Sequence, residues 1–193
     1  PASKGAASAS GTGTSKVITY TPTADYNGSD SFVVQVSDGL GGTDTITVNV
    51  TIQPVNDAPI ISEGASSGVT MDEDGAPTAF SKTLNVTDVD AGDTLTWSIS
   101  APAVNGTATA ASGIGTSNAI GYTPAANYNG SDSFVVLVSD GNGGTDTINV
   151  NVTVTAVNDA PVVTNPSAQT NAEGEAVSLQ IAASDVDSVS LTY

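Results

Sequence analysis

The sequence predicts an all-β protein built from tandem two-sheet sandwiches of immunoglobulin type. Two observations carry this prediction. Long stretches alternate strictly between apolar and polar residues, as strands with one buried face do. In addition, one block of sequence recurs almost unchanged further along the chain. No stretch shows a sustained helical period, so a helical fold is a poor competitor.

The recurring block sets the organisation of the chain. Residues 20–61 and 122–163 are identical at 32 of 42 positions, so the repeat period is 102 residues. A weaker correspondence pairs Glu73 with Glu173 and indicates that a third unit begins after residue 161. We therefore expect the C-terminal part of one repeat, one complete repeat and the N-terminal part of the next, at residues 1–56, 57–158 and 159–193.

Two strands in each repeat are expected to form a hairpin. Every second residue is apolar in segments 45–52 and 147–154, and again in 32–36 and 134–138. The glycine-rich turns SDGLGG and SDGNGG separate the two strands of each hairpin. Seven short strands in about 100 residues suit a two-sheet sandwich, with Trp97 packed in its core. The other strand candidates of the complete repeat lie near residues 59–62 and 68–71 taken together as one, and near 79–87, 94–100, 106–111 and 118–123.

Composition excludes several classes of function. The chain has 3 Lys and Arg against 20 Asp and Glu, and a formal charge of −17. Nucleic acids and anionic membranes are bound through Lys and Arg, so both are disfavoured as partners. Without Cys or His the chain cannot build a thiolate or imidazole catalytic site. No apolar run approaches the roughly 20 residues of a spanning helix. We therefore expect no enzyme activity, no nucleic-acid partner and no direct membrane insertion.

The residues that could carry chemistry are carboxylates at predicted strand ends. Asp88 and Asp90 lie in the expected second-to-third loop, and Asp140 lies in the sixth-to-seventh loop. In a seven-strand sandwich these loops share one end with the arriving linker, which contains Asn56 and Asp57. The sequence therefore predicts a cluster of oxygen ligands at the junction between repeats.

Two further aspartates belong to this prediction. Asp93 is an additional candidate in the second-to-third loop, and Asp30 precedes the sixth strand of the first unit. Carboxylates within about 6 Å repel one another by roughly 1–3 kcal/mol per pair, and a divalent cation reverses that sign. An all-oxygen ligand set favours Ca²⁺ over Zn²⁺ or Cu²⁺. The structural alternative is that Asp and Asn are simply favoured turn residues in an exposed acidic protein.

Four blocks of the sequence resemble a known family. The blocks YTPxxxYNGSDSF, SDGxGGT, VNDAP and DVDAGDTLTWSI resemble the cadherin-like or VCBS-type tandem repeats of large secreted (RTX-type) bacterial adhesins. The resemblance covers essentially the whole chain. It implies tandem immunoglobulin or cadherin-like Greek-key β-sandwiches at the bacterial cell surface, with calcium at the linkers and a role in adhesion or biofilm cohesion.

The resemblance also implies partners and ligands. The partners are neighbouring repeats of the same polypeptide and ligands of a cell surface or matrix. One or two ions per junction are expected, because Val55 and Ala58 stand where the full cadherin pattern has further oxygen ligands. The implied metal ligands are Asp30, Asn56, Asp57, Glu73, Asp88, Asp90, Asp132, Asp140, Asn158, Asp159, Asp185 and Asp187.

We interpret the chain as a non-catalytic spacer of an extracellular adhesin, and three alternatives remain open. A carbohydrate- or ice-binding repeat would want exposed aromatics or a regular threonine ladder, whereas aromatic residues make up 5% of the chain. A glycosidase needs two carboxylates flanking one cleft, whereas the candidate pairs recur at each junction. A subunit of an extracellular fibre or sheath differs from a spacer mainly in its assembly.

Overall fold

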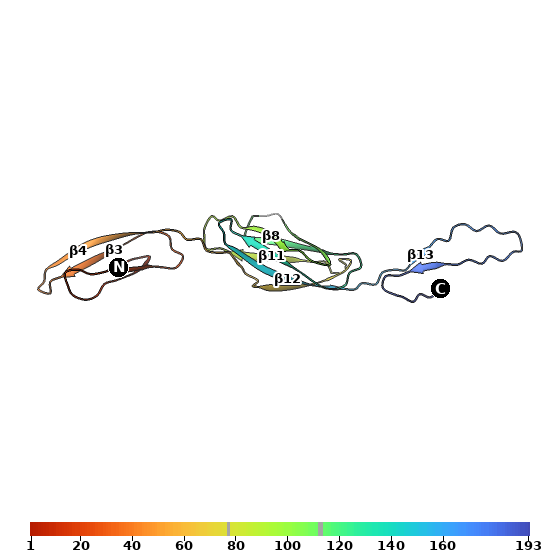
Figure 1. Ribbon diagram of the computed structural model, residues 1–193, viewed down its shortest axis with the longest axis horizontal. Coiled ribbons are helices and arrows are strands. Elements are labelled where there is room, and N and C mark those ends of the chain that lie inside the picture. The colour runs from red at the N-terminus through yellow and green to blue at the C-terminus, as the bar shows by residue number, and fades with distance from the viewer. Residues whose placement is uncertain (77, 112–113) are drawn as a thin grey trace.

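The computed structural model describes residues 1–76, 78–111 and 114–193, and these contain strands but no helix. The predicted all-β class is therefore confirmed. Figure 1 shows three β units in a row. The first unit holds β1 (Gly5–Ser8), β2 (Thr19–Pro22), β3 (Gly28–Ser37) and β4 (Thr43–Ile52). The second holds β5 (Ile60–Ile61), β6 (Ser66–Asp72), β7 (Lys82–Thr87), β8 (Thr96–Ala101), β9 (Gly106–Ala110), β10 (Ser117–Pro124), β11 (Gly130–Ser139) and β12 (Thr145–Thr155). The third holds β13 (Val162–Thr164) and β14 (Ala182–Ser184).

The second unit is a complete sandwich of two four-stranded sheets. One sheet has the order β5-β7-β10-β9 and the other the order β6-β12-β11-β8. The first strand is split, because β5 pairs antiparallel with β7 whereas β6 runs parallel to β12. The turn between β5 and β6 contains Gly64 at φ 79°, which glycine adopts without steric cost. The two candidate segments near residues 59–62 and 68–71 therefore belong to different sheets, and the sandwich has eight strands.

The core of the sandwich lies between the two sheets. In the β11–β12 hairpin, Phe134 is opposite Val150 and Val136 is opposite Ile148. These four side chains are at most 1% exposed, as the alternating pattern predicted. Trp97 is also buried, as expected, and its indole N–H donates to a backbone carbonyl at 3.0 Å. Burial of one residue in two along each strand therefore produces the core.

The first unit repeats the hairpin of the second in the same register. Phe32 lies opposite Val48 in the β3–β4 pair, as Phe134 lies opposite Val150. The β1–β2 pair likewise matches β9–β10, with a glycine opposite a proline at one end of each pair. The corresponding segments of the two units therefore have the same strand pairing.

The third unit contains one strand pair. In it, Val163 lies opposite Ala183, just as Ile61 lies opposite Val86 in the β5–β7 pair. The expected unit boundaries, at residues 56/57 and 158/159, fall in strand-free segments between β4 and β5 and between β12 and β13. Among the described residues, no helix is long and apolar enough to cross a membrane.

Candidate functional site

Three aspartates converge in the loop between β7 and β8. Asp88, Asp90 and Asp93 each place a carboxylate oxygen so that all three oxygens lie within 4.8 Å of one another. All three residues are half-buried. The loop is held closed by its own hydrogen bonds, because the Asp90 N–H donates to Asp88 Oδ1 at 2.9 Å. Three like charges at this spacing repel one another strongly at neutral pH.

The linker that arrives from the first unit docks directly on this loop. The Asp57 N–H donates to Asp90 Oδ2 at 2.7 Å, and the Asn56 side-chain amide donates to Asp140 Oδ2 at 2.8 Å. Asp140 directly follows β11, so residues far apart in sequence meet at one end of the sandwich. The structure therefore brings together five of the residues that the sequence predicted as ligands of one junction.

Asp140 organises the hairpin turn beside the linker. Its side chain is 1% exposed, and backbone N–H groups of Asn142 and Gly144 donate to it. The hydrogen bond from the Asn56 side chain, reinforced by these backbone donors, lowers the pKa of Asp140. Gly144 is required here, because a Cβ on it would lie 2.1 Å from the Asp140 carboxylate and 2.8 Å from Ala58. Asp140 is therefore an ionised anchor for the linker.

Two carboxylate oxygens of the cluster are buried without any hydrogen-bond donor. Within the described part of the chain, these are Asp88 Oδ2 and Asp93 Oδ2. A buried, unpaired carboxylate oxygen is costly, so native structures supply it with a donor or a cation. The neighbouring Asp93 Oδ1 does have a donor, the side-chain amide of Asn142 at 2.8 Å. The cluster thus offers two free, charged oxygens that fit an oxygen-preferring cation.

The second junction repeats the contact between linker and loop. The Asp159 N–H donates to Asp187 Oδ2 at 2.5 Å, and the Asp187 N–H donates to Asp185 Oδ1 at 2.8 Å. The Asn158 side chain donates to the Asp159 carbonyl, as Asn56 does to Asp57. The NDAP motif of the linker and the DVD motif of the loop therefore make the same contact at both junctions.

The complete repeat contributes additional acids to this second junction. Glu73 follows β6, is 7% exposed and accepts a hydrogen bond from the Val157 N–H at 2.7 Å. Burial raises the pKa of Asp159, and the nearby charges of Asp74, Asp187, Glu73 and Asp185 raise it further. A raised aspartate pKa from several negative neighbours marks a site where a cation would relieve repulsion.

Asp30 and Asp132 lie elsewhere. The prediction that Asp30 precedes its strand is wrong, because both residues are the third residue of a strand, β3 or β11. Each is 8% exposed, and the hydrogen bonds that it accepts from the described residues all come from its own unit. For Asp132 the donors are the Tyr122 hydroxyl at 2.9 Å and three backbone N–H groups. These two carboxylates hold the β2–β3 and β10–β11 segments of their units together through hydrogen bonds, and they do not join the cluster.

Replacing Asp132 with alanine should lower the free energy of unfolding of the complete repeat by about 3 kcal/mol, because four donors lose a buried acceptor. Burial alone would raise the pKa of Asp132, but donors from Asn105, Ser133, Tyr122 and Val104 outweigh it and lower the pKa. Its stabilising effect is thus complete above about pH 4 and is lost as the pH falls. Urea unfolding at neutral pH and at about pH 3 measures how much stability each protein loses in acid. This loss should be smaller in the variant than in wild type. An equal acid loss in both proteins would contradict this role.

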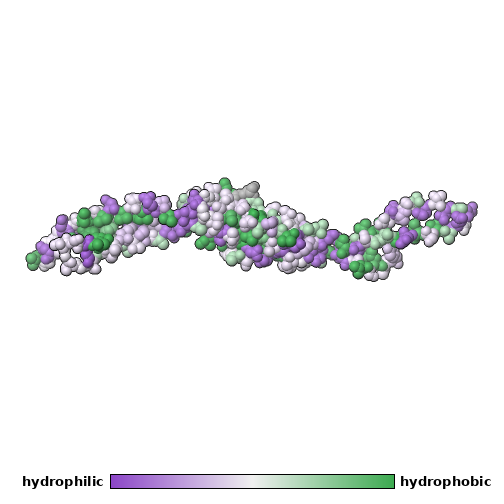
Figure 2. All heavy atoms as spheres, in the orientation of Figure 1, coloured by the Kyte–Doolittle hydropathy of each residue, from purple (hydrophilic) through white to green (hydrophobic). Residues whose placement is uncertain are grey.

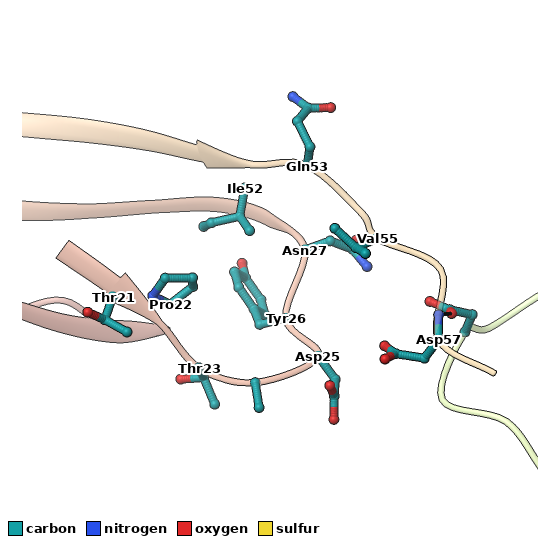
Figure 3. A pocket seen from close by; sticks show the side chains of 12 residues that line it. Thr21, Pro22, Thr23, Asp25, Tyr26, Asn27, Ile52, Gln53, Val55 and Asp57 are labelled. Carbon is teal, nitrogen blue, oxygen red and sulfur yellow. Dashed lines mark hydrogen bonds between the residues drawn. The ribbon is translucent and has the colours of Figure 1, made fainter. Parts of the chain in front are cut away.

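Sequence reasoning missed Asp25. It lies in the loop between β2 and β3, at φ 60°, and lines a hollow that also includes Asp57 and Asp90. Figure 3 shows Asp25 and Asp57 bordering this hollow between the loop and the linker. The sequence did offer one signal, which is the position of Asp25 in the repeat. It aligns with Asn127 of the complete repeat, which has the same conformation, at φ 55°. The first unit can therefore add one carboxylate to the first junction.

Comparisons with known proteins agree with this architecture. A model of a family described as the bacterial Ig domain matches residues 2–51 and 56–153. No curated protein matches the chain. Among solved structures, human CDH23 EC21-23 is 18% identical with a TM-score of 0.52, covering 88% of this chain and 62% of that chain. Protocadherin gamma B7 extracellular cadherin domains 1-4 are 16% identical with a TM-score of 0.51, covering 88% and 44%.

These structural likenesses establish the fold and nothing more. An endo-fucoidan hydrolase from glycoside hydrolase family 107 also matches, at 22% identity and a TM-score of 0.40. The match covers 81% of this chain but only 24% of the hydrolase, so the chain spans about a quarter of that enzyme.

Proposed function

The chain belongs to the bacterial Ig domain family, and on this premise we propose that it is a non-catalytic, extracellular spacer whose junctions between repeats are stiffened by calcium. The observation that carries the proposal is the docking of the linker on an aspartate cluster that retains two buried, unpaired oxygens. Tandem sandwiches in a row suit a spacer, which holds a distal domain away from the cell.

Calcium is the ion that the donors favour. Every candidate ligand is a carboxylate, amide or carbonyl oxygen, and the chain has no Cys or His to favour a softer metal. At the first junction Asp88, Asp90 and Asp93 would hold the ion, with Asp57 and Asp25 adding charge from the preceding unit. The corresponding acids of the second junction are Glu73, Asp74, Asp159, Asp185 and Asp187.

The proposed mechanism is a change in the stiffness of the junction between repeats. With no cation, the clustered carboxylates repel one another and favour a splayed junction. A bound cation links the linker to the loops of the next repeat and restricts the angle between them. Extracellular calcium-binding modules bind Ca²⁺ with a Kd of roughly 10⁻⁴–10⁻³ M. With such an affinity, calcium would occupy the junction outside a cell. The charge of −17 keeps a long array soluble by self-repulsion.

We place this spacer in a bacterial cell-surface adhesin that supports cell adhesion or biofilm cohesion. The family membership supports an extracellular repeat, and the repeated motifs support an array. The docked linkers support contacts between neighbouring repeats of the same polypeptide. Ligands of a cell surface or matrix would bind outside these junctions.

Small-angle scattering of the full chain, extrapolated to zero concentration, tests the proposal. Millimolar Ca²⁺ should increase the maximum dimension and narrow the range of shapes, because the two linkers become fixed. The variant Asp88→Asn with Asp93→Asn should lose the response at the first junction. A matched control that changes Asp44→Asn and Glu175→Gln removes the same charge away from the junctions and should respond like wild type. An identical scattering curve with and without calcium would refute the proposal.

A further inference from the structure

The turn between β11 and β12 contains an asparagine that is directly followed by a glycine. Asn142 and Gly143 lie in the segment DGNGG, between the last residue of β11 and the first residue of β12. Gly141 and Gly143 have φ 83° and φ 110°, which glycine adopts without steric cost. A turn so rich in glycine changes its backbone conformation easily.

The Asn142 side chain is part of the aspartate cluster at the first junction. Its Nδ2 donates to Asp93 Oδ1 at 2.8 Å, while Asp93 Oδ2 is buried without a donor among the described residues. Its backbone N–H donates to Asp140 Oδ1 at 2.7 Å, and Asp140 also accepts from the linker residue Asn56. Figure 2 shows hydrophilic residues where the first and second units meet. A chemical change at Asn142 therefore reaches both the cluster and the linker.

We propose that Asn142 deamidates spontaneously, so that the first junction gains a carboxylate. The Gly143 nitrogen gives its proton to water and bonds to Asn142 Cγ. The bond from Cγ to Nδ2 breaks, and Nδ2 takes up a proton and leaves as ammonia. Water then opens the five-membered ring. Cleavage of the new bond at Cγ produces an aspartate at position 142, and cleavage of the main-chain bond produces an isoaspartate. One water replaces one ammonia, so no oxidant or further reactant is needed.

Three further Asn–Gly steps in the chain provide internal comparisons. They are Asn27–Gly28, Asn105–Gly106 and Asn129–Gly130. In each of them the glycine is the first residue of a paired strand, β3, β9 or β11. Ring closure there has to pull the glycine nitrogen away from its place in a strand pair, whereas Gly143 belongs to no strand. The structure therefore favours deamidation at Asn142 over the other three.

Either product changes the first junction. An aspartate replaces the donor to Asp93 by an acceptor and raises the number of clustered carboxylates from three to four, which strengthens their mutual repulsion. An isoaspartate carries the main chain through the former side chain, so the backbone of the turn becomes one atom longer. The Gly144 N–H, which donates to Asp140 Oδ1 at 3.0 Å, would then be displaced. Deamidation therefore destabilises the turn that holds Asn56.

The first unit supplies a matched control. Leu40 occupies the position of Asn142, 102 residues earlier, in the segment DGLGG. Its N–H donates to Asp38 Oδ1 at 2.8 Å, and the Gly42 N–H donates to the same oxygen at 2.9 Å. The same turn therefore forms without the asparagine side chain. The variant Asn142→Leu should keep the turn, and it cannot deamidate there.

Incubation of the full chain in mildly alkaline buffer with a chelator, followed by digestion with a protease that cuts before aspartate, tests the proposal. Digestion releases residues 140–145, in which Asn142 is the one asparagine. Over time this peptide should shift to the mass of the aspartate form. A new cut before position 142 marks aspartate, and an uncut product of the same mass marks isoaspartate. The other three Asn–Gly steps should convert at least about fivefold more slowly, because a strand pair must open first.

Melting of the complete repeat in chelator, followed by Trp97 fluorescence, measures the effect on the junction. Asn142→Asp and aged wild type should both melt lower than fresh wild type, whereas Asn142→Leu should melt the same before and after ageing. The proposal would be overturned by an unconverted 140–145 peptide, by conversion no faster than at the other steps, or by converted protein that melts like fresh protein.

Calcium provides a separate measurement. Asn142→Asp should gain more melting temperature from calcium than wild type, because it adds a ligand charge, and this expectation rests on the calcium function proposed above. A wild type without any calcium response would refute that function alone. Absence of conversion at Asn142 would refute the deamidation alone.

Discussion

Replacing Phe134 with alanine should lower the free energy of unfolding of the complete repeat by about 3–5 kcal/mol. Its side chain is 1% exposed and stacks on Tyr122, with ring centroids 6.0 Å apart and planes at 4°. It also contacts Phe80, with centroids 6.4 Å apart. The substitution leaves a cavity in the core between the two sheets. Urea unfolding followed by Trp97 fluorescence should show an earlier midpoint.

The repeat supplies a matched control in Phe32, the counterpart of Phe134. Phe32 stacks on Tyr20 with centroids 5.7 Å apart and planes at 4°, so the local contact is the same. Phe32 lies in the first unit, however, and is not part of the core cluster that contains Trp97, so Phe32→Ala should leave the Trp97 transition unchanged. If both substitutions shifted that transition equally, the complete repeat would not be an independent core.

Adding calcium should raise the melting temperature of the chain by roughly 5–15 °C, provided the ion binds the folded junctions alone. At ten to a hundred times a Kd of roughly 10⁻⁴–10⁻³ M, mass action stabilises by about 1.4–2.7 kcal/mol. We expect this gain because the ion would pair with Asp88 Oδ2 and Asp93 Oδ2, which are buried and have no hydrogen-bond donor among the described residues. Calorimetry with calcium and with a chelator measures it.

The double variant Asp88→Asn with Asp93→Asn separates ion binding from charge relief. It should melt higher than wild type in chelator, because fewer like charges repel, and it should gain less from calcium. Magnesium should stabilise wild type less than calcium, since Mg²⁺ requires stricter octahedral geometry. A calcium gain that is as large in the variant as in wild type would place the ion elsewhere.

The strand pattern was readable from sequence because it is local. Alternation along residues 134–138 and 147–154 predicted which side chains are buried, and the hairpin has that arrangement. The near-identical blocks predicted the same register in β3–β4 and β11–β12, since equal side chains on equal turns leave one favourable pairing. Clustering of the loop and linker acids was also foreseeable, because a seven-strand sandwich has its loops at two ends only.

Other features depended on contacts between distant residues. Asp30 and Asp132 look like junction acids in the sequence. In the structure each carboxylate accepts hydrogen bonds from its own unit instead, since a buried carboxylate needs nearby N–H and O–H donors. Asp25 looks like a turn residue, yet it borders the hollow that contains Asp57. The side-chain neighbours of an acid are set by packing, which spacing does not encode.

The sequence by itself determined the all-β class, the repeat period, the hairpin registers and the acidic motifs. Tertiary structure alone decided that the first strand of the repeat splits between two sheets and that the Asp57 N–H docks on Asp90. It also decided that, among the described residues, Asp88 Oδ2 and Asp93 Oδ2 are buried without a hydrogen-bond donor. The physical reason is that periodicity reports which face of a strand avoids water, whereas the identity of the covering surface depends on long-range packing.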